Sequence, residues 1–84
     1  MDEARAAVLE LVARRGPDKT VCPSEVAKAL TGPDGDWREQ MASVHRAVDA
    51  LVEEGRVELS WKRARLPRRS GPYRIAVPSR NVSE

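Results

Sequence analysis

Residues 55–77 read GRVELSWKRARLPRRSGPYRIAV, and this stretch decides the fold. An apolar residue stands at every second position of residues 57–61 and again of residues 73–77. Alternation with a period of two is typical of half-buried strands. Residues 63–72, here called the basic segment, contain four arginines and two prolines, a composition typical of a mobile loop. The stretch therefore predicts two paired strands joined by a basic loop.

The chain before these strands has helical periodicity. Residues 3–15 carry apolar residues at three- and four-residue spacing, which predicts a helix with one buried face. Asp2 is placed to cap the start of this helix, and Gly16-Pro17 to end it. Residues 19–21 then form a short extended stretch. We expect that stretch to add a third strand to the sheet.

A second helix is expected from the dipeptide Cys22-Pro23 to about residues 31–33. Proline is favoured at the first helical position, where its missing N–H would have no partner. Glu25 stands three residues after Cys22, in the position of a capping-box carboxylate. The sequence therefore predicts a short helix whose first turn is fixed by its own side chains.

The third helix has the clearest pattern, from Trp37 to about Glu54. Asp36 is a natural N-cap, and Glu39, three residues later, completes a capping box. Gly55 is a typical residue just past a helix end. We expect this helix to bury one apolar face and to expose a charged one.

The order of these elements predicts an α+β fold of the winged helix-turn-helix type. The second and third helices form the helix-turn-helix, and a C-terminal β-hairpin carries the basic segment as its wing. We expect one domain over residues 1–78 and a flexible C-terminal tail over residues 79–84. A three-helix domain with a disordered basic tail is the alternative, and the alternation in both strand segments argues against it.

Two stretches carry a resemblance to a known family. They are KTVCPSEVAKAL at residues 19–30 and DWREQM at residues 36–41, and weaker matches lie in the hairpin. The resemblance as a whole covers most of residues 5–77. The chain resembles a family of small bacterial domains of unknown function that are expected to be winged helices. The family's wing is longer and less rich in arginine than residues 62–70 here. The resemblance implies the fold and implies no activity.

Composition excludes several classes of protein. The chain has 84 residues, so it has room for one small core. It has one cysteine, which excludes an internal disulfide and a cysteine-rich zinc site. It lacks an apolar run long enough for a membrane span, and its charged N-terminus is unlike a signal peptide. We expect a cytoplasmic protein with no membrane partner, no cofactor and, because no catalytic set emerges, no enzymatic activity.

Charge is concentrated at the C-terminal end of the chain. Residues 1–55 contain seven basic and eleven acidic side chains, whereas residues 56–84 contain eight basic and two acidic ones. A basic pole on a nearly neutral body attracts polyanions, which favours duplex DNA as the partner. The alternative is a set of solvated strand and loop positions without a partner.

The candidate nucleic-acid contacts lie on the basic segment and on the outward side of the third helix. Residues 36–55 contain five acidic side chains and two arginines, which disfavours contact of this helix with phosphate. We therefore expect weakly specific binding led by the basic segment. The candidates are Arg63, Arg65, Arg68 and Arg69 for phosphate, and Arg38, Ser43 and Arg46 for the groove.

Other interpretations of the same residues stay open. The acidic third helix also fits a protein-interaction or self-association module that binds no DNA. Arg38 has a local alternative, an ion pair with Asp34 or Asp36, and Arg46 has one as a solvated side chain.

Four further side chains need an interpretation. Cys22 is expected as a small buried residue at a helix start, with a redox or metal-binding role as the alternative. We expect His45 at the boundary of the third helix's apolar face. Both Trp37 and Trp61 are expected to bury most of their area in the core. Base stacking by Trp61 at an exposed edge of the sheet is the alternative.

Overall fold

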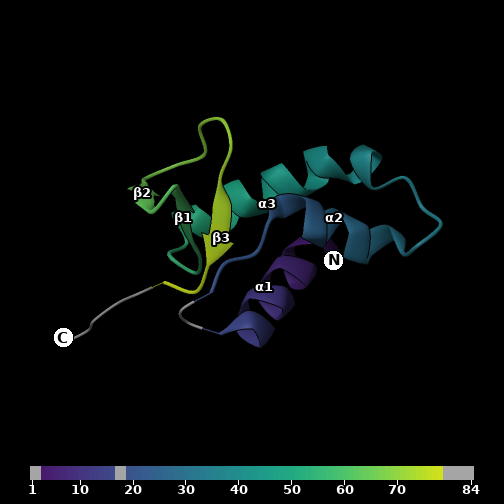
Figure 1. The fold of residues 1–84 in the computed structure, drawn as a ribbon, viewed down its shortest axis with the longest axis horizontal. Coiled ribbons are helices and arrows are strands. Elements are labelled where there is room, and N and C mark those ends of the chain that lie inside the picture. The colour runs from purple at the N-terminus through teal and green to yellow at the C-terminus, as the bar shows by residue number, and fades with distance from the viewer. Residues whose placement is uncertain (1–2, 17–18, 79–84) are drawn as a thin grey trace.

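The computed structural model describes residues 3–16 and 19–78. It shows an α+β fold, with three helices and a three-stranded antiparallel sheet in an arrangement compatible with a winged helix (Figure 1). The sheet lies at one end of the molecule and the turn after α2 at the other. The elements are α1 (Glu3–Arg15), α2 (Pro23–Thr31), the 3-10 helix η1 (Trp37–Gln40), α3 (Met41–Glu53), β1 (Glu58–Trp61), β2 (Ala64–Leu66) and β3 (Arg74–Ala76).

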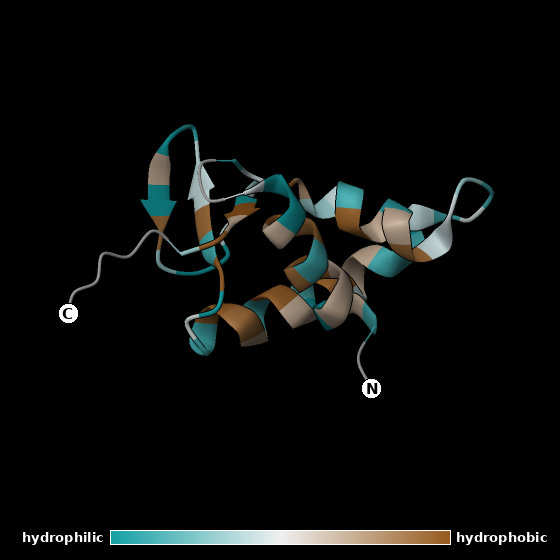
Figure 2. Ribbon diagram, turned by 90° about the horizontal axis from the view of Figure 1, so that it is seen from below, coloured by the Kyte–Doolittle hydropathy of each residue, from teal (hydrophilic) through white to brown (hydrophobic). Residues whose placement is uncertain are grey.

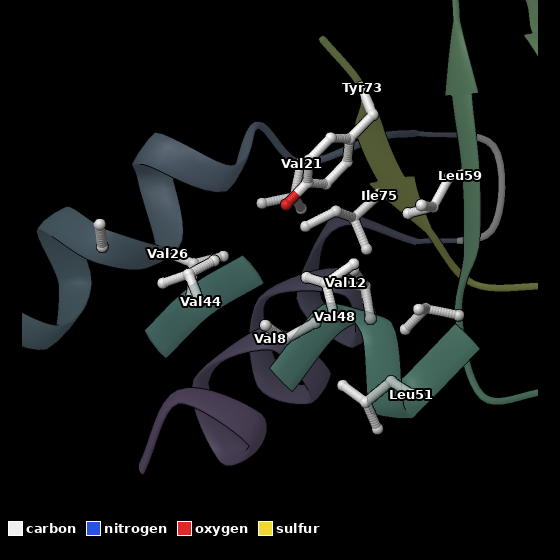
Figure 3. Packing of buried hydrophobic residues seen from close by; sticks show 12 residues of the cluster. Val8, Val12, Val21, Val26, Val44, Val48, Leu51, Leu59, Tyr73 and Ile75 are labelled. Carbon is white, nitrogen blue, oxygen red and sulfur yellow. The ribbon is translucent and has the colours of Figure 1, made fainter. Parts of the chain in front are cut away.

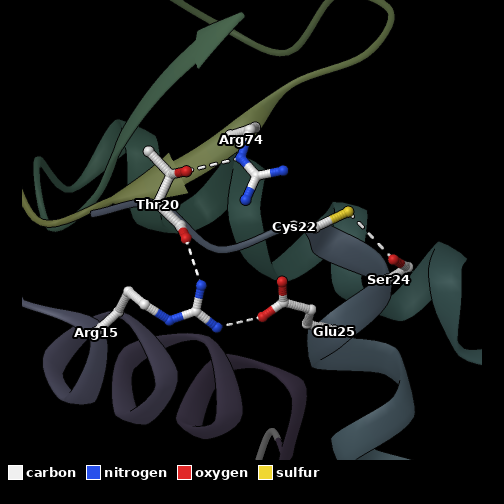
Figure 4. A network of polar contacts seen from close by, with 6 residues as sticks. All are labelled: Arg15, Thr20, Cys22, Ser24, Glu25 and Arg74. Atoms are coloured by element: carbon white, nitrogen blue, oxygen red, sulfur yellow. Dashed lines mark hydrogen bonds and ion pairs between the residues drawn. The ribbon is translucent and has the colours of Figure 1, made fainter.

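The first two helices have the expected bounds, but the capping box expected for α2 is wrong. Cys22 takes the N-cap position in extended conformation and makes no side-chain cap. The carboxylate of Glu25 instead forms an ion pair with Arg15 of α1 (Figure 4). A charged guanidinium is a stronger partner than a backbone N–H, so this carboxylate joins two helices instead of closing its own. The predicted cap at Asp2 lies outside the described residues, as do Pro17 and the tail expected at residues 79–84.

The third helix begins with a tighter turn than the periodicity predicted. Residues 37–40 form η1, and the α-helix proper starts at Met41. The Asp36 Oδ1 atom accepts a hydrogen bond from the backbone N–H of Arg38 at 3.1 Å. The backbone N–H of Glu39 donates to the carbonyl of Asp36 instead, as a 3-10 turn requires. Asp36 is thus the expected N-cap, but the capping box with Glu39 is not formed.

The sheet has the strand order β2-β1-β3, so β1 lies in the middle. The expected pairing of the two alternating segments is confirmed, with Leu59 opposite Ile75. The expected third strand at residues 19–21 is present as a single bridge, in which Val21 and Ile75 exchange backbone hydrogen bonds of 2.7 and 2.8 Å.

The prediction that the whole basic segment is a loop is wrong, because part of it forms a strand. Residues 64–66 form β2 and pair with β1 through a two-residue turn at Lys62 and Arg63. The pairing sets Leu66 opposite Leu59, where it packs against the core. This apolar contact is the physical reason for the added strand.

The core is small and built almost wholly from aliphatic residues (Figure 3). It joins one face of each helix to the inner face of the sheet, while the turn between β1 and β2 is hydrophilic (Figure 2). The fully buried side chains of largest volume are Leu51, Leu59, Ile75, Val8, Val21, Val26, Val44 and Val48.

The two tryptophans differ in how deeply they are buried. Trp37 is partly buried and packs against the core, in line with the expectation. Trp61 also buries more than half of its area, but at 38% exposure it lies at the edge of the core and not inside it as expected. Trp61 ends β1 opposite Ala64, whose methyl group is too small to cover an indole. Trp61 therefore lies on the same side of β1 as the buried Leu59, but beyond the edge of the core.

Candidate nucleic-acid interface

The chain that follows β2 is tied to the outward face of α3 by an ion pair. Arg69 donates from Nε and Nη2 to the two carboxylate oxygens of Asp49, at 2.9 and 3.0 Å. These bonds hold the pKa of Asp49 below its ordinary value and raise the pKa of Arg69. Two parallel bonds fix the orientation of the guanidinium as well as its position. Arg69 is therefore engaged within the molecule and is not a freely available phosphate contact.

A second tie joins α3 to the start of β3. The His45 Nδ1 atom lies 2.7 Å from the hydroxyl oxygen of Tyr73, which is buried. Burial raises the pKa of Tyr73, so the phenol keeps its proton. Burial also lowers the pKa of His45, with a smaller lowering from Arg69 and an opposing effect from Asp49. The imidazole and the tyrosine hydroxyl thus share one hydrogen bond between α3 and the residue before β3.

The lowering of the His45 pKa by burial makes the stability of the domain depend on pH. His45 is the only histidine. Its folded pKa lies below its unfolded value of 6.5, so below that pH the unfolded chain binds more protons than the folded one. We expect the free energy of unfolding to be constant above about pH 7 and to fall as the pH drops through about 6.5 towards 5. Urea titrations across this range measure it. A His45→Gln variant should lack the fall, and an equal fall in that variant would refute the assignment.

A groove of about 680 Å³ separates the C-terminal half of α3 from the basic segment. Arg68 and Arg69 line one side of it, and Asp49 lies on the other. Arg46 precedes Asp49 by three residues, so it lies on the same helix face. The fold therefore brings two of the candidate arginines, Arg68 and Arg69, to one groove, and Arg46 lies one helical turn before it on α3.

The hairpin of β1 and β2 carries the other two candidates from the basic segment. Arg65 lies opposite Ser60 in the sheet, and its Nε atom is 3.2 Å from a carboxylate oxygen of Glu58. Arg63 stands in the β1–β2 turn, and its side chain is exposed. Both line a smaller hollow of about 230 Å³ over the sheet. Arg65 is thus partly engaged, whereas Arg63 has no ion-pair partner in the described part of the chain.

Arg38 lies apart from the other candidates. Its guanidinium carbon is 4.6 Å from the centre of the Trp37 ring, and the Lys28 Nζ atom is 5.2 Å from the same ring. The stacking replaces the ion pair with Asp34 or Asp36 that the sequence left open. η1 follows the turn at the end of the molecule opposite the sheet (Figure 1). The structure therefore does not bring Arg38 to the basic segment.

A comparison with family models identifies the family of this chain. The model of DUF3253, described as a protein of unknown function, matches residues 1–78. The chain belongs to DUF3253. The expected membership in a family of unknown function is thus confirmed, and it brings no activity with it. A search of curated proteins gives no match to this DUF3253 chain.

The third helix of this DUF3253 domain is less acidic in effect than its sequence implies. Asp49 is bound by Arg69, and Glu54, just past the helix, accepts two bonds of 2.6 and 2.8 Å from Arg5 of α1. The bond from Arg5 lowers the pKa of Glu54. Two of the five carboxylates counted against phosphate contact are therefore compensated within the chain. Ser43, the remaining candidate on α3, is half-buried.

Cys22 of the DUF3253 domain is partly buried, and its Sγ atom lies 3.1 Å from Ser24 Oγ (Figure 4). Nearby, Thr20 accepts at its carbonyl from Arg15 and at its hydroxyl from Arg74, which ties α1 to β3. Within residues 3–16 and 19–78, no three potential metal-binding side chains lie together. None of the helices in those ranges has the length and hydropathy to cross a membrane.

Proposed function

We propose that this DUF3253 domain binds duplex DNA through its basic segment, with weak sequence specificity and a role related to transcription. One observation carries the proposal. The exposed cations without an ion pair in the described ranges include several on the hairpin, the basic segment and the facing side of α3, namely Lys62, Arg63, Arg68 and Arg46. Free cations release counterions from the duplex on binding, and this release dominates affinity.

The ion pairs divide the candidate arginines into two groups. Arg63 and Arg68 contact phosphate directly, and Arg46 lies at the groove face of α3. Arg65 and Arg69 hold the hairpin and the basic segment in place through Glu58 and Asp49. The basic segment thus presents its free cations on a fixed backbone, which lowers the entropy lost on binding.

A salt titration tests the proposal. A fluorescently labelled duplex of random sequence is titrated with the protein at 50 to 200 mM salt, and anisotropy reports binding. Four phosphate contacts give a slope of about −3.6 in log K against log salt, or about a 150-fold loss of affinity over this range. No binding at tens of micromolar protein in the lowest salt would refute the proposal and favour a protein partner.

A pair of variants assigns the contacts. Arg63→Ala with Arg68→Ala removes two of the four free cations, so the slope should fall to about −1.8. Arg14→Ala is the matched control, because Arg14 is exposed on α1 and pairs with Glu10. The control should keep the slope of the unaltered protein. An unchanged slope in the double variant would contradict the assigned contacts.

A further inference from the structure

Trp61 is the exposed large hydrophobic residue among residues 3–16 and 19–78, at 38% exposure. Within the described chain, no other ring stacks on Trp61 and no cation lies over it. Trp37, in contrast, has Lys28 and Arg38 over its ring. It lies at the end of β1, directly before the turn to β2. The exposed part of the indole thus lies beside the turn, where a molecule from outside can contact it.

The turn beside Trp61 keeps two cations in an unfavourable backbone conformation. Lys62 and Arg63 have φ of +52° and +72°. A two-residue hairpin turn of this kind is normally made by Asn-Gly or Gly-containing pairs, because side chains with a Cβ atom are disfavoured at positive φ. Strain of this kind is maintained mostly where the side chains have a function. Here the strained residues are both basic and both exposed.

The hairpin tip, residues 61–65, therefore combines a partly exposed indole with three cations, of which Arg65 pairs with Glu58. Its sequence is WKRAR, and it contains no acidic side chain. Proteins bind unpaired bases by stacking them on aromatic rings while cations contact the flanking phosphates. An intact duplex offers no open base face to an indole, so a ligand that uses the whole tip must contain an unpaired base.

We infer that the hairpin tip binds nucleic acid at an unpaired base, which stacks on Trp61 while Lys62 and Arg63 contact the neighbouring phosphates. The inference rests on the proposed function and narrows its ligand to DNA with a locally open or single-stranded segment. Arg68 and Arg46 then contact the paired DNA beside the opening. The positive charge of the hairpin tip and the partly exposed ring of Trp61 favour this ligand over an uncharged apolar partner.

Two labelled duplexes of equal length test the inference, one fully paired and one with three central mismatches. The unaltered protein should bind the mismatched duplex about tenfold more tightly, the size expected for one stacked base. Trp61→Ala should abolish this preference and leave the affinity and salt slope for the paired duplex unchanged. Trp61→Phe should keep part of the preference. Circular dichroism verifies that each variant is folded.

A fluorescence measurement reports the contact itself. Trp37→Phe keeps a ring against the core and leaves Trp61 as the only tryptophan of the chain. The mismatched duplex should quench its emission, and the paired duplex should not. Paired-duplex binding without quenching or preference would overturn the inference and leave the proposed function standing. Failure to bind either duplex would overturn both. A shift of emission with anionic lipid vesicles, without quenching by DNA, would overturn the inference in favour of a membrane surface.

Discussion

Replacing Leu51 by alanine is expected to lower the free energy of unfolding by about 3 kcal/mol. Leu51 is fully buried and belongs to the same cluster as Val8 and Val12 of α1 (Figure 3). The valines around it are short and β-branched, so they cannot rotate into the space left by the shortened side chain. A domain of this length has roughly 4–13 kcal/mol of stability in total, so the change removes a large share.

Urea unfolding followed by circular dichroism measures this loss. The midpoint should fall with an unchanged dependence on urea, because the folded and unfolded surfaces stay nearly the same. Val52→Ala is the matched control, since Val52 is the next residue of α3 and is only partly buried. Its cost should stay below about 1.5 kcal/mol. Equal costs for the two variants would show that α3 does not pack as described.

The second large effect is a gain in stability. Lys62→Asn together with Arg63→Gly should raise the free energy of unfolding by about 2 kcal/mol, because the left-handed conformation costs most side chains about 1 kcal/mol each. Glycine avoids this cost because it has no Cβ atom, and asparagine avoids most of it because its short side chain hydrogen-bonds locally in this conformation. In a domain of this size, each kcal/mol raises the melting temperature by roughly 4–8 °C. The backbone conformation stays the same, since φ at both positions is already positive.

A second variant separates strain from charge. Lys62→Ala with Arg63→Ala removes both cations but keeps a Cβ atom at each position, so its melting temperature should stay close to that of the unaltered protein. Thermal unfolding of the two variants side by side gives the comparison. The same rise in both would mean that the gain comes from relief of charge repulsion, and the argument from strain would fail.

The sequence predicted the elements whose signal is local. The three helices and the pairing of β1 with β3 follow from the spacing of apolar residues, and the bridge at Val21 follows from one short extended stretch. It missed β2, because the turn at Lys62 and Arg63 has neither the asparagine nor the glycine by which such turns are recognised. A turn whose residues do not favour its backbone conformation cannot be recognised from the local sequence.

The candidate site was predicted only in part for a related reason. The sequence identified Arg63 and Arg68, which are exposed. It gave no sign that Arg69 pairs with Asp49 or Arg5 with Glu54, because these partners are 20 and 49 residues apart. Periodicity carries no information about such pairs. It also placed Trp61 on the inward side of its strand without showing where the core ends.

The bridge between Val21 and Ile75 has a consequence for the order of events during synthesis. It joins the chain just before α2 to the last strand, and the same strand pairs with β1. The helices alone leave the inner faces of α1 and α3 without the sheet that covers them, so a nascent chain gains most of its stabilising burial only when Ile75 has emerged from the ribosome. Folding of this domain is therefore completed after translation of its last strand.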